Sequence, residues 1–130
     1  MSLEIGVRGR ADEVVNESNT AAAACSGALT VYGTPYMIAL MEKASWTSIA
    51  PHLAEGESTV GTKLNVSHLS ATPMGMKVWA ESEVTAVDGK RIEFKVTAGD
   101  EKGLIGEGTH ERFIVTNDRF LAKAARKLEG

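Results

Sequence analysis

The alternation of apolar and polar residues predicts one long helix near the middle of the chain. Apolar positions recur with helical spacing over residues 36–50, and Thr34-Pro35 supplies a good N-cap followed by a proline that the first helical turn tolerates. The predicted helix is apolar nearly all round, with Glu42 and Lys43 as its charged residues. That pattern is typical of a helix buried on most sides.

After this helix the period of the pattern changes to two, which predicts antiparallel strands. The first strand places five residues on one face: Val60, Thr62, Leu64, Val66 and His68. Further strands are expected over residues 76–86, 92–98 and about 104–116, and in the last one Gly106 and Gly108 indicate curvature or a bulge.

Three details complete the expected order of elements. Residues 11–16 fit one more strand before the helix. The strands before and after Asp88-Gly89 pair apolar residues with apolar residues if the loop between them has three residues. We therefore expect a loop over residues 87–89 with a left-handed Gly89. Asn117 is expected to cap a short terminal helix whose apolar stripe is Phe120, Leu121, Ala124 and Leu128. The fold class is therefore α+β, with an antiparallel sheet wrapped around one buried helix.

Length and composition define the broad class of protein. A chain of 130 residues corresponds to one domain, residues 1–130, in which the small and polar residues 16–33 form a loop or lid. A net charge of −3 argues against nucleic-acid binding, and no apolar run is long enough to span a membrane. Cys25 has no partner for a disulfide, so the cytoplasm is the expected location. The histidines lack metal-ligand spacing, and no metal site is expected.

Three residues depart from a pure packing pattern. Glu42 is a carboxylate in an apolar helix, His68 ends the apolar face of a strand, and Thr34 lies at the positive end of the helix. A carboxylate, an imidazole and a hydroxyl are the groups that acyl transfer to water requires. Taken singly, each has an ordinary structural explanation: a helix carboxylate at an edge, a satisfied histidine and a routine helix start.

Several short motifs occur in an order that resembles a known family. They are Thr34 with residues 39–42 (ALME), residues 60–62 (VGT), 66–68 (VSH) and 71–73 (ATP), and residues 108–112 (GTHER). Over about residues 31–125 this pattern is similar to the fluoroacetyl-CoA thioesterases of the hot-dog fold.

The resemblance implies a function and a set of site residues. Thr34, Glu42 and His68 match the family's catalytic threonine, glutamate and histidine, while Gly61 and Arg112 match its substrate-binding positions. Such proteins are typically homodimers that bind acyl-CoA at the subunit interface and need no cofactor beyond the CoA of the substrate. A tetramer of two dimers is compatible with the sequence.

One departure from the family concerns the acyl group. The enzyme that gives the family its name has phenylalanines in a lid before the threonine, whereas residues 21–33 contain none here. We therefore expect little specificity for fluoroacetyl, and a preference for longer or bulkier acyl groups held against Tyr36.

The residues leave other functions open. The alternatives are a hot-dog hydratase or dehydratase acting on CoA or carrier-protein thioesters, and a non-catalytic acyl-CoA binder. For a thioesterase, the sequence leaves open whether Glu42 acts as a nucleophile or as a general base.

Overall fold

A computed structural model describes residues 3–130. In chain order its elements are β1 (Arg8–Val14), α1 (Thr34–Ile49), the 3₁₀ turn η1 (Ala50–His52), β2 (Glu57–His68), β3 (Lys77–Asp88), β4 (Arg91–Asp100), β5 (Gly103–Thr116), α2 (Asn117–Ala125) and the 3₁₀ turn η2 (Arg126–Glu129). This is the order that the sequence predicts. The N-terminal strand is confirmed, although it covers residues 8–14 and not residues 11–16.

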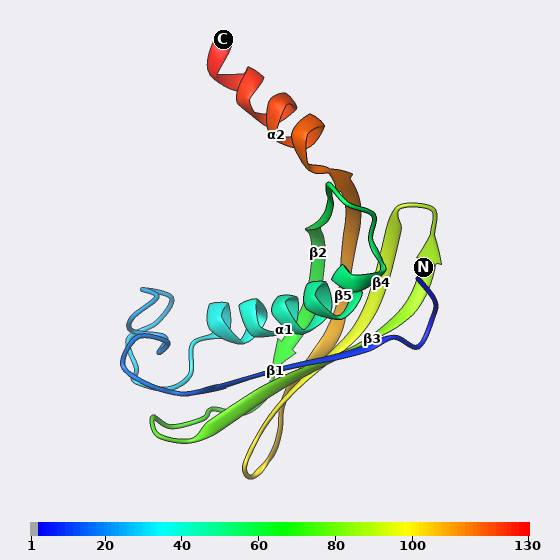
Figure 1. Cartoon of the computed structure of the whole chain (residues 1–130). Helices are drawn as coiled ribbons and strands as arrows, with labels where there is room; N and C mark the ends of the chain where they lie inside the picture. Colours follow the sequence, from blue (N-terminus) through cyan, green and yellow to red (C-terminus); the bar gives the residue numbers. More distant parts are fainter. Residues whose placement is uncertain (1–2) are drawn as a thin grey trace.

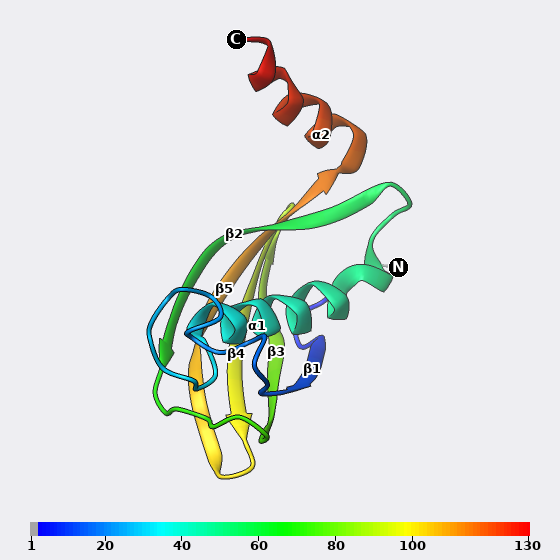
Figure 2. The same ribbon diagram turned by 90° about the vertical axis from the view of Figure 1, so that its left-hand side faces the viewer.

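The five strands form one antiparallel sheet in the order β1-β3-β4-β5-β2. The sheet curves around α1, which crosses its concave side (Figures 1 and 2). Strands β1 and β2 are its edges, and β2 is the longer, with 12 residues against 7. An open edge of this length presents backbone groups that favour pairing with another strand.

Helix α1 is buried on one flank. Its buried residues are Met37, Leu40, Met41, Ala44, Ser45 and Ile49. The apolar members of this set share one core with inward residues of β3 and β4, such as Val84 and Phe94. Ala39, Lys43 and Trp46 are exposed, Trp46 to 46%. The prediction of a helix buried on most sides is therefore wrong for a single chain, because the sheet covers only one flank.

A bulge in β2 changes which face its residues occupy. Gly61 and Lys63 pair with consecutive residues of β5, so Thr62 is the extra residue. Of the five residues predicted to share one face of this strand, the last three, Leu64, Val66 and His68, do so. Val60 lies on the opposite face, and Gly61 takes its place toward the helix. Strict alternation was the wrong assumption at this point of the strand.

The connection between β3 and β4 also differs from the prediction. It is a two-residue loop that begins with Gly89, rather than a three-residue loop over residues 87–89. A bulge at Thr85 shifts the register, so that Val84 pairs with Phe94 and the buried faces still match. The bulge resolves the mismatch that the longer loop was expected to resolve. Gly89 has a φ of +62°, left-handed as predicted.

Two glycines of β5 allow close approaches to neighbouring elements. A Cβ at Gly106 would lie 2.6 Å from Met37 Sδ, and one at Gly108 would lie 2.1 Å from the carbonyl oxygen of Asn65. The pairing of β4 with β5 skips Ile105, so a bulge lies beside Gly106 as expected. These glycines let the start of α1 and the end of β2 come close to the same strand.

Residues 15–33 run along the start of α1 as turns and isolated bridges. Thr20 pairs with Tyr32, and Val31 pairs with Pro73 in the connection between β2 and β3. Asn19, Thr20 and Tyr32 are buried, whereas most of residues 21–30 are exposed. The two ends of the segment are thus attached to the body of the protein.

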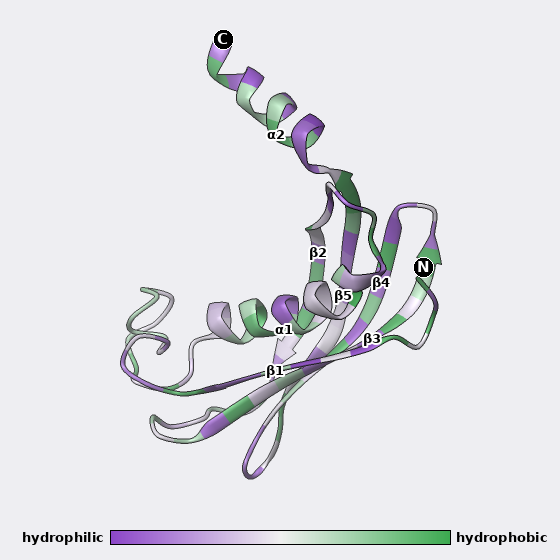
Figure 3. Cartoon of the chain, in the orientation of Figure 1, coloured by the Kyte–Doolittle hydropathy of each residue, from purple (hydrophilic) through white to green (hydrophobic). Residues whose placement is uncertain are grey.

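The C-terminal helix extends away from the sheet (Figures 1 and 2). None of the residues of α2 is buried, and apolar and polar residues mix along it (Figure 3). Phe120, Leu121 and Leu128 of its expected stripe are exposed. Its N-cap is Thr116, one residue before the predicted Asn117.

An antiparallel sheet wrapped around one long helix, with a short helix after the last strand, is the hot-dog fold that the sequence predicts. Within residues 3–130, we find no helix with the length and apolar character needed to cross a membrane.

Candidate active site

Thr34 and His68 meet where α1 begins and β2 ends. The Oγ1 atom of Thr34 lies 2.7 Å from Nδ1 of His68, within hydrogen-bond distance. The sequence predicts Thr34 as the N-cap of the helix, but Gly33 is the N-cap and no side chain caps it. That prediction is wrong because the carbonyl oxygen of Gly33 accepts the first helical hydrogen bond, from the N–H of Met37, and the Thr34 hydroxyl is bonded to the imidazole instead. Thr34 still lies in the first turn, where the helix dipole favours negative charge.

The imidazole of His68 has one unused nitrogen. Its Nε2 is buried and has no hydrogen-bond partner among residues 3–130. Burial lowers the pKa of His68, with a smaller opposing effect from the backbone of Ser70. When the Thr34 hydroxyl donates to Nδ1, the neutral ring carries its proton on Nε2 and can donate it to a ligand.

An open groove of about 280 Å³ borders this hydroxyl–imidazole pair. It is lined by Ala21, Val31, Tyr32, Thr34, His68, Leu69, Ser70 and Ala71. Tyr32 is 1% exposed, and its hydroxyl donates a hydrogen bond to Glu13 of β1. Burial and this carboxylate raise the pKa of Tyr32. The accessible walls of the groove are therefore mostly small aliphatic and hydroxyl groups.

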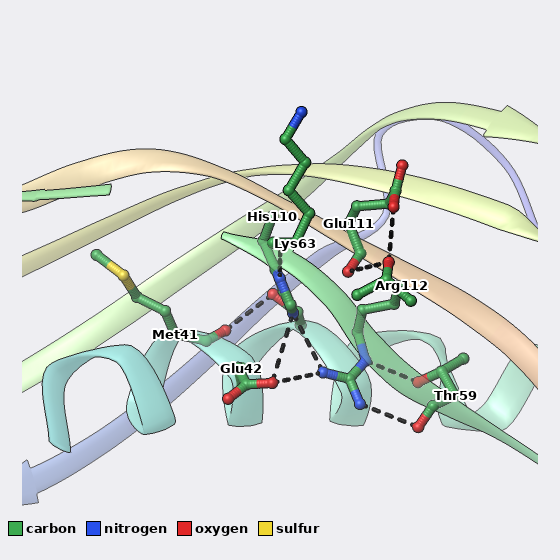
Figure 4. A network of polar contacts seen from close by, with 9 residues as sticks. Met41, Glu42, Thr59, Lys63, His110, Glu111 and Arg112 are labelled. Carbon is green, nitrogen blue, oxygen red and sulfur yellow. Dashed lines mark hydrogen bonds and ion pairs between the residues drawn. The ribbon is translucent and has the colours of Figure 1, made fainter. Parts of the chain in front are cut away.

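Glu42 belongs to a second cluster, further along the same helix. Its Oε2 accepts a hydrogen bond from Nη1 of Arg112 at 3.1 Å and lies 4.0 Å from Nε2 of His110 (Figure 4). The side chain is 35% exposed, so its charge is not fully desolvated. Among the described residues, only Oε2 has a hydrogen-bond partner, which leaves Oε1 free for water or a ligand.

Arg112 is held rigidly beside this carboxylate. Its Nε donates to Oγ1 of Thr59 at 2.8 Å, and its Nη2 donates to the carbonyl oxygen of Thr59 at 3.0 Å. The residue is 6% exposed, and burial lowers the pKa of Arg112 while Glu42 opposes that shift. A guanidinium remains protonated in proteins. The cluster therefore contains a fixed positive charge next to Glu42.

Gly61 lets these side chains approach the backbone of β2. A Cβ at this position would lie 2.6 Å from Oε2 of Glu42, 3.2 Å from Nη1 of Arg112 and 3.3 Å from Cε1 of His110. We call Glu42, Gly61, His110 and Arg112 the carboxylate cluster. The two predicted substrate-binding residues, Gly61 and Arg112, thus lie with Glu42 and not with Thr34.

The hydroxyl–imidazole pair and the carboxylate cluster do not meet within one chain. Eight residues separate Thr34 from Glu42 on α1, which is a rise of about 12 Å at 1.5 Å per residue. On β2, His68 lies seven residues after Gly61, or about 20 Å at the usual strand rise. One chain therefore carries two separate clusters of candidate residues.

Tyr36, the remaining predicted contact to substrate, lies elsewhere. It is half-buried and lines a groove between α1 and β1 together with Asp12, Glu13, Ala39, Leu40 and Lys43. At 3.6 residues per turn, Tyr36 and Glu42 point about 120° apart around the helix. Within one chain, the structure places Tyr36 in neither cluster.

Sequence reasoning missed His110 and Thr59 as parts of the site. His110 is 2% exposed, and its ring contacts Arg112, which lies two residues further along the same strand. Residues at i and i+2 of a strand share a face. The quoted GTHER motif therefore contained the signal, because a role for Arg112 implies a neighbouring role for His110.

The donor set of the site suits acid–base chemistry. Within residues 3–130, no three His, Cys, Asp or Glu side chains are placed to hold a metal ion. His110 uses both ring nitrogens on protein partners, and His68 uses Nδ1 on Thr34. The groups available to a substrate are the carboxylate of Glu42, the Nε2 of His68 and the hydroxyl of Thr34.

Comparisons with known proteins agree with this fold. The model of the fluoroacetyl-CoA-specific thioesterase family matches residues 15–118. The fluoroacetyl-CoA thioesterase of Streptantibioticus cattleyicolor is 40% identical over 97 residues, which are 75% of this chain and 70% of that protein.

Solved structures extend the similarity to nearly the whole chain. A structure of the fluoroacetyl-CoA thioesterase FlK superimposes with a TM-score of 0.93 at 34% identity and covers 98% of both chains. A Thermus thermophilus hypothetical protein, described as a thioesterase superfamily member, gives a TM-score of 0.89 at 30% identity and covers 97% of this chain and 93% of that chain.

The fold and these relatives define a thioester hydrolase of the hot-dog superfamily. Within that class, the chain belongs to the fluoroacetyl-CoA-specific thioesterase family.

Proposed function

We propose that two copies of this chain together hydrolyse acyl-CoA thioesters, each active site taking its hydroxyl–imidazole pair from one copy and its carboxylate cluster from the other. The observation that carries the proposal is the separation of Thr34 and His68 from Glu42 within a chain that belongs to a thioesterase family. A second copy supplies the missing half of each site.

The open edge of β2 offers a way to join the halves. Antiparallel pairing of β2 with its own copy, centred on Asn65 and with Thr62 again the extra residue, would place His68 of one copy opposite Gly61 of the other. Two equivalent complete sites would then form by symmetry. The exposed flank of α1 that carries Glu42 and Trp46 would be covered in the same assembly.

In a complete site, the proposed chemistry is a base-assisted attack of water. Oε2 of Glu42 stays with Arg112 while Oε1 accepts a proton from water, whose oxygen bonds to the thioester carbonyl carbon. The start of α1 at Thr34 stabilises the negative charge that develops on the carbonyl oxygen. The carbon–sulfur bond breaks while Nε2–H of His68 donates a hydrogen bond to the departing sulfur. Glu42 returns its proton to that thiolate, which leaves both residues in their starting forms. The products are a carboxylic acid and free CoA.

The groove beside Thr34 supports a broad acyl preference. Its accessible walls are small, and the ring of Tyr32 is buried and tied to Glu13. Discrimination between fluoroacetyl and acetyl requires contacts that differ for the two groups, and walls made mostly of small side chains provide few. We propose that acyl groups larger than acetyl are better substrates.

A thiol-release assay tests this function. The wild-type protein is incubated with fluoroacetyl-, acetyl- and branched or aromatic acyl-CoA, and the free CoA thiol is measured. Release that disappears in Glu42→Gln supports the proposal. Hydration or dehydration of an unsaturated or 3-hydroxyacyl thioester without thiol release would support the hydratase alternative, and binding without any turnover would support the non-catalytic binder.

A further inference from the structure

The imidazole of His110 is buried and contacted from three strands. Its Nδ1 lies 2.9 Å from the carbonyl oxygen of Lys63 on β2, and its Nε2 lies 3.1 Å from Nη1 of Arg112 on β5. The ring of Phe94 on β4 stacks against it, with centroids 5.9 Å apart and planes inclined by 27°. Figure 4 shows the ring between β2 and Arg112. Such a ring has little freedom to rotate.

The partners of His110 determine where its proton lies. An arginine N–H can only donate, so Nε2 of His110 must accept and cannot carry a proton. A carbonyl oxygen can only accept, so Nδ1 must carry the proton and donate it to Lys63. The ring is thus neutral and in a single tautomer. Burial lowers the pKa of His110, which favours the same neutral form.

This tautomer gives Nη1 of Arg112 an acceptor for each of its two hydrogens. Nε and Nη2 of the guanidinium donate to Thr59, and the two hydrogens of Nη1 have two acceptors, Oε2 of Glu42 and Nε2 of His110. Without the imidazole, one buried N–H of a charged group would lose its acceptor. The guanidinium would then gain freedom to turn, and the carboxylate bonded to it would move as well.

We infer that His110 is a positioning residue, which fixes Arg112 and through it the carboxylate of Glu42. This inference rests on the proposed function, in which Glu42 is the base. The chain of contacts runs from the carbonyl of Lys63 through the imidazole and the guanidinium to Glu42. It begins beside the bulge at Thr62, so the bulge and the carboxylate are parts of one arrangement.

Protonation of His110 would break this chain. Glu42 faces the ring from α1, and Arg112 faces it from β5. Glu111, on the other face of β5, acts on it only as a weaker electrostatic influence. From β2 the carbonyl of Lys63 contacts the ring, and the uncharged Phe94 covers it from β4. A proton on Nε2 would point at the Arg112 N–H and place two positive charges together. The low pKa of His110 delays this event to acidic pH, and there the positioning of Glu42 fails.

Two substitutions separate positioning from packing. In His110→Gln, the amide oxygen occupies the region of Nε2 and can still accept from Arg112, whereas His110→Leu cannot accept at all. We expect kcat to fall about 10- to 100-fold in His110→Leu, the scale of a misplaced catalytic group, with KM little changed. His110→Gln should recover most of that loss in kcat. Because glutamine does not titrate, the acidic limb of its pH profile should lack the contribution of His110.

A control and a spectroscopic measurement complete the test. Ser82→Ala removes another buried contact to α1, the 3.1 Å bond to the carbonyl of Ala44, and should leave kcat unchanged. The ¹⁵N shifts of the His110 ring in the wild-type protein should show a neutral ring protonated on Nδ1, and they remain decisive if His110→Leu does not fold.

Different results would overturn different claims. An Nε2-protonated ring, a folded His110→Leu with unchanged kcat, or a His110→Gln as impaired as His110→Leu would each refute the positioning role. A wild-type protein that releases no thiol from any acyl-CoA, yet shows the Nδ1–H tautomer, would refute the proposed function while the hydrogen-bond chain stands.

Discussion

Replacing Gly61 by alanine tests whether the position of the Glu42 carboxylate controls turnover. The new methyl group would lie 2.6 Å from Oε2 of Glu42, so this oxygen must retreat by roughly 0.8 Å to reach an ordinary contact of 3.4 Å. Nη1 of Arg112 and Cε1 of His110, at 3.2 and 3.3 Å, limit the directions in which the group can move. A displacement of about 1 Å at a reacting group costs about 100-fold in rate.

The fold should tolerate this change. Gly61 is exposed on an edge strand, its φ is not in the left-handed region, and the tightest new contact is with the mobile end of a side chain. Alanine also restricts the unfolded chain, which is worth about 0.4–1 kcal/mol in favour of folding. We therefore expect the free energy of unfolding to change by less than about 1 kcal/mol while kcat falls about 100-fold.

The assay is thiol release from the best acyl-CoA, combined with denaturant unfolding. Asn65→Ala is the control on the same strand, because it changes a side chain on the outer face, where Asn65 pairs with Thr109. A folded Gly61→Ala protein that keeps kcat within about threefold of wild type would refute the reasoning, because the close approach of Glu42 to β2 would then have no role in catalysis.

Three further predictions follow from the site. Glu42→Gln should lower kcat at least ~100-fold, and His68→Ala should also lower it strongly. Thr34→Ala should cost at most about 2.7–4 kcal/mol of transition-state stabilisation. Steady-state kinetics on folded variants checks all three, and full turnover by Glu42→Gln would contradict the assignment. The ratio of kcat/KM for fluoroacetyl-CoA to that for acetyl-CoA should be modest, and a ratio above ~10⁴ would show that aromatic contacts from elsewhere rebuild the selective wall. Light scattering should give at least twice the chain mass of 13.8 kDa at micromolar concentration, and a mass near 13.8 kDa would exclude the shared site.

The order of elements was predictable because each element has a strong local signal. The Pro35 start, the apolar run and the change of period from helix to strand each constrain the backbone locally. The bulges at Thr62 and Thr85 have no such signal, since an extra residue in one strand is defined only by its pairing with another. This is why the predicted faces were wrong at Val60 and the predicted hairpin loop was one residue too long.

The candidate site was predictable as a set of residues, but not as an arrangement in space. Thr34 and His68 are distant in sequence, and their contact depends on the close approach of α1 to β5 at Gly106. The partners of Glu42 depend on the bulge that turns Gly61 toward the helix. Motifs along the chain give residue identities, whereas distances between them come from the tertiary fold.

Subunit complementation tests the central claim most directly. We expect Glu42→Gln and His68→Ala each to be nearly inactive alone. The two variants are unfolded and refolded together in equal amounts, so that half of the dimers contain one copy of each. Every mixed dimer would have one complete site, with His68 from one copy and Glu42 from the other, and activity should return to about one quarter of wild type. A mixture that exchanges subunits yet stays as inactive as its components would show that the catalytic groups act within one chain.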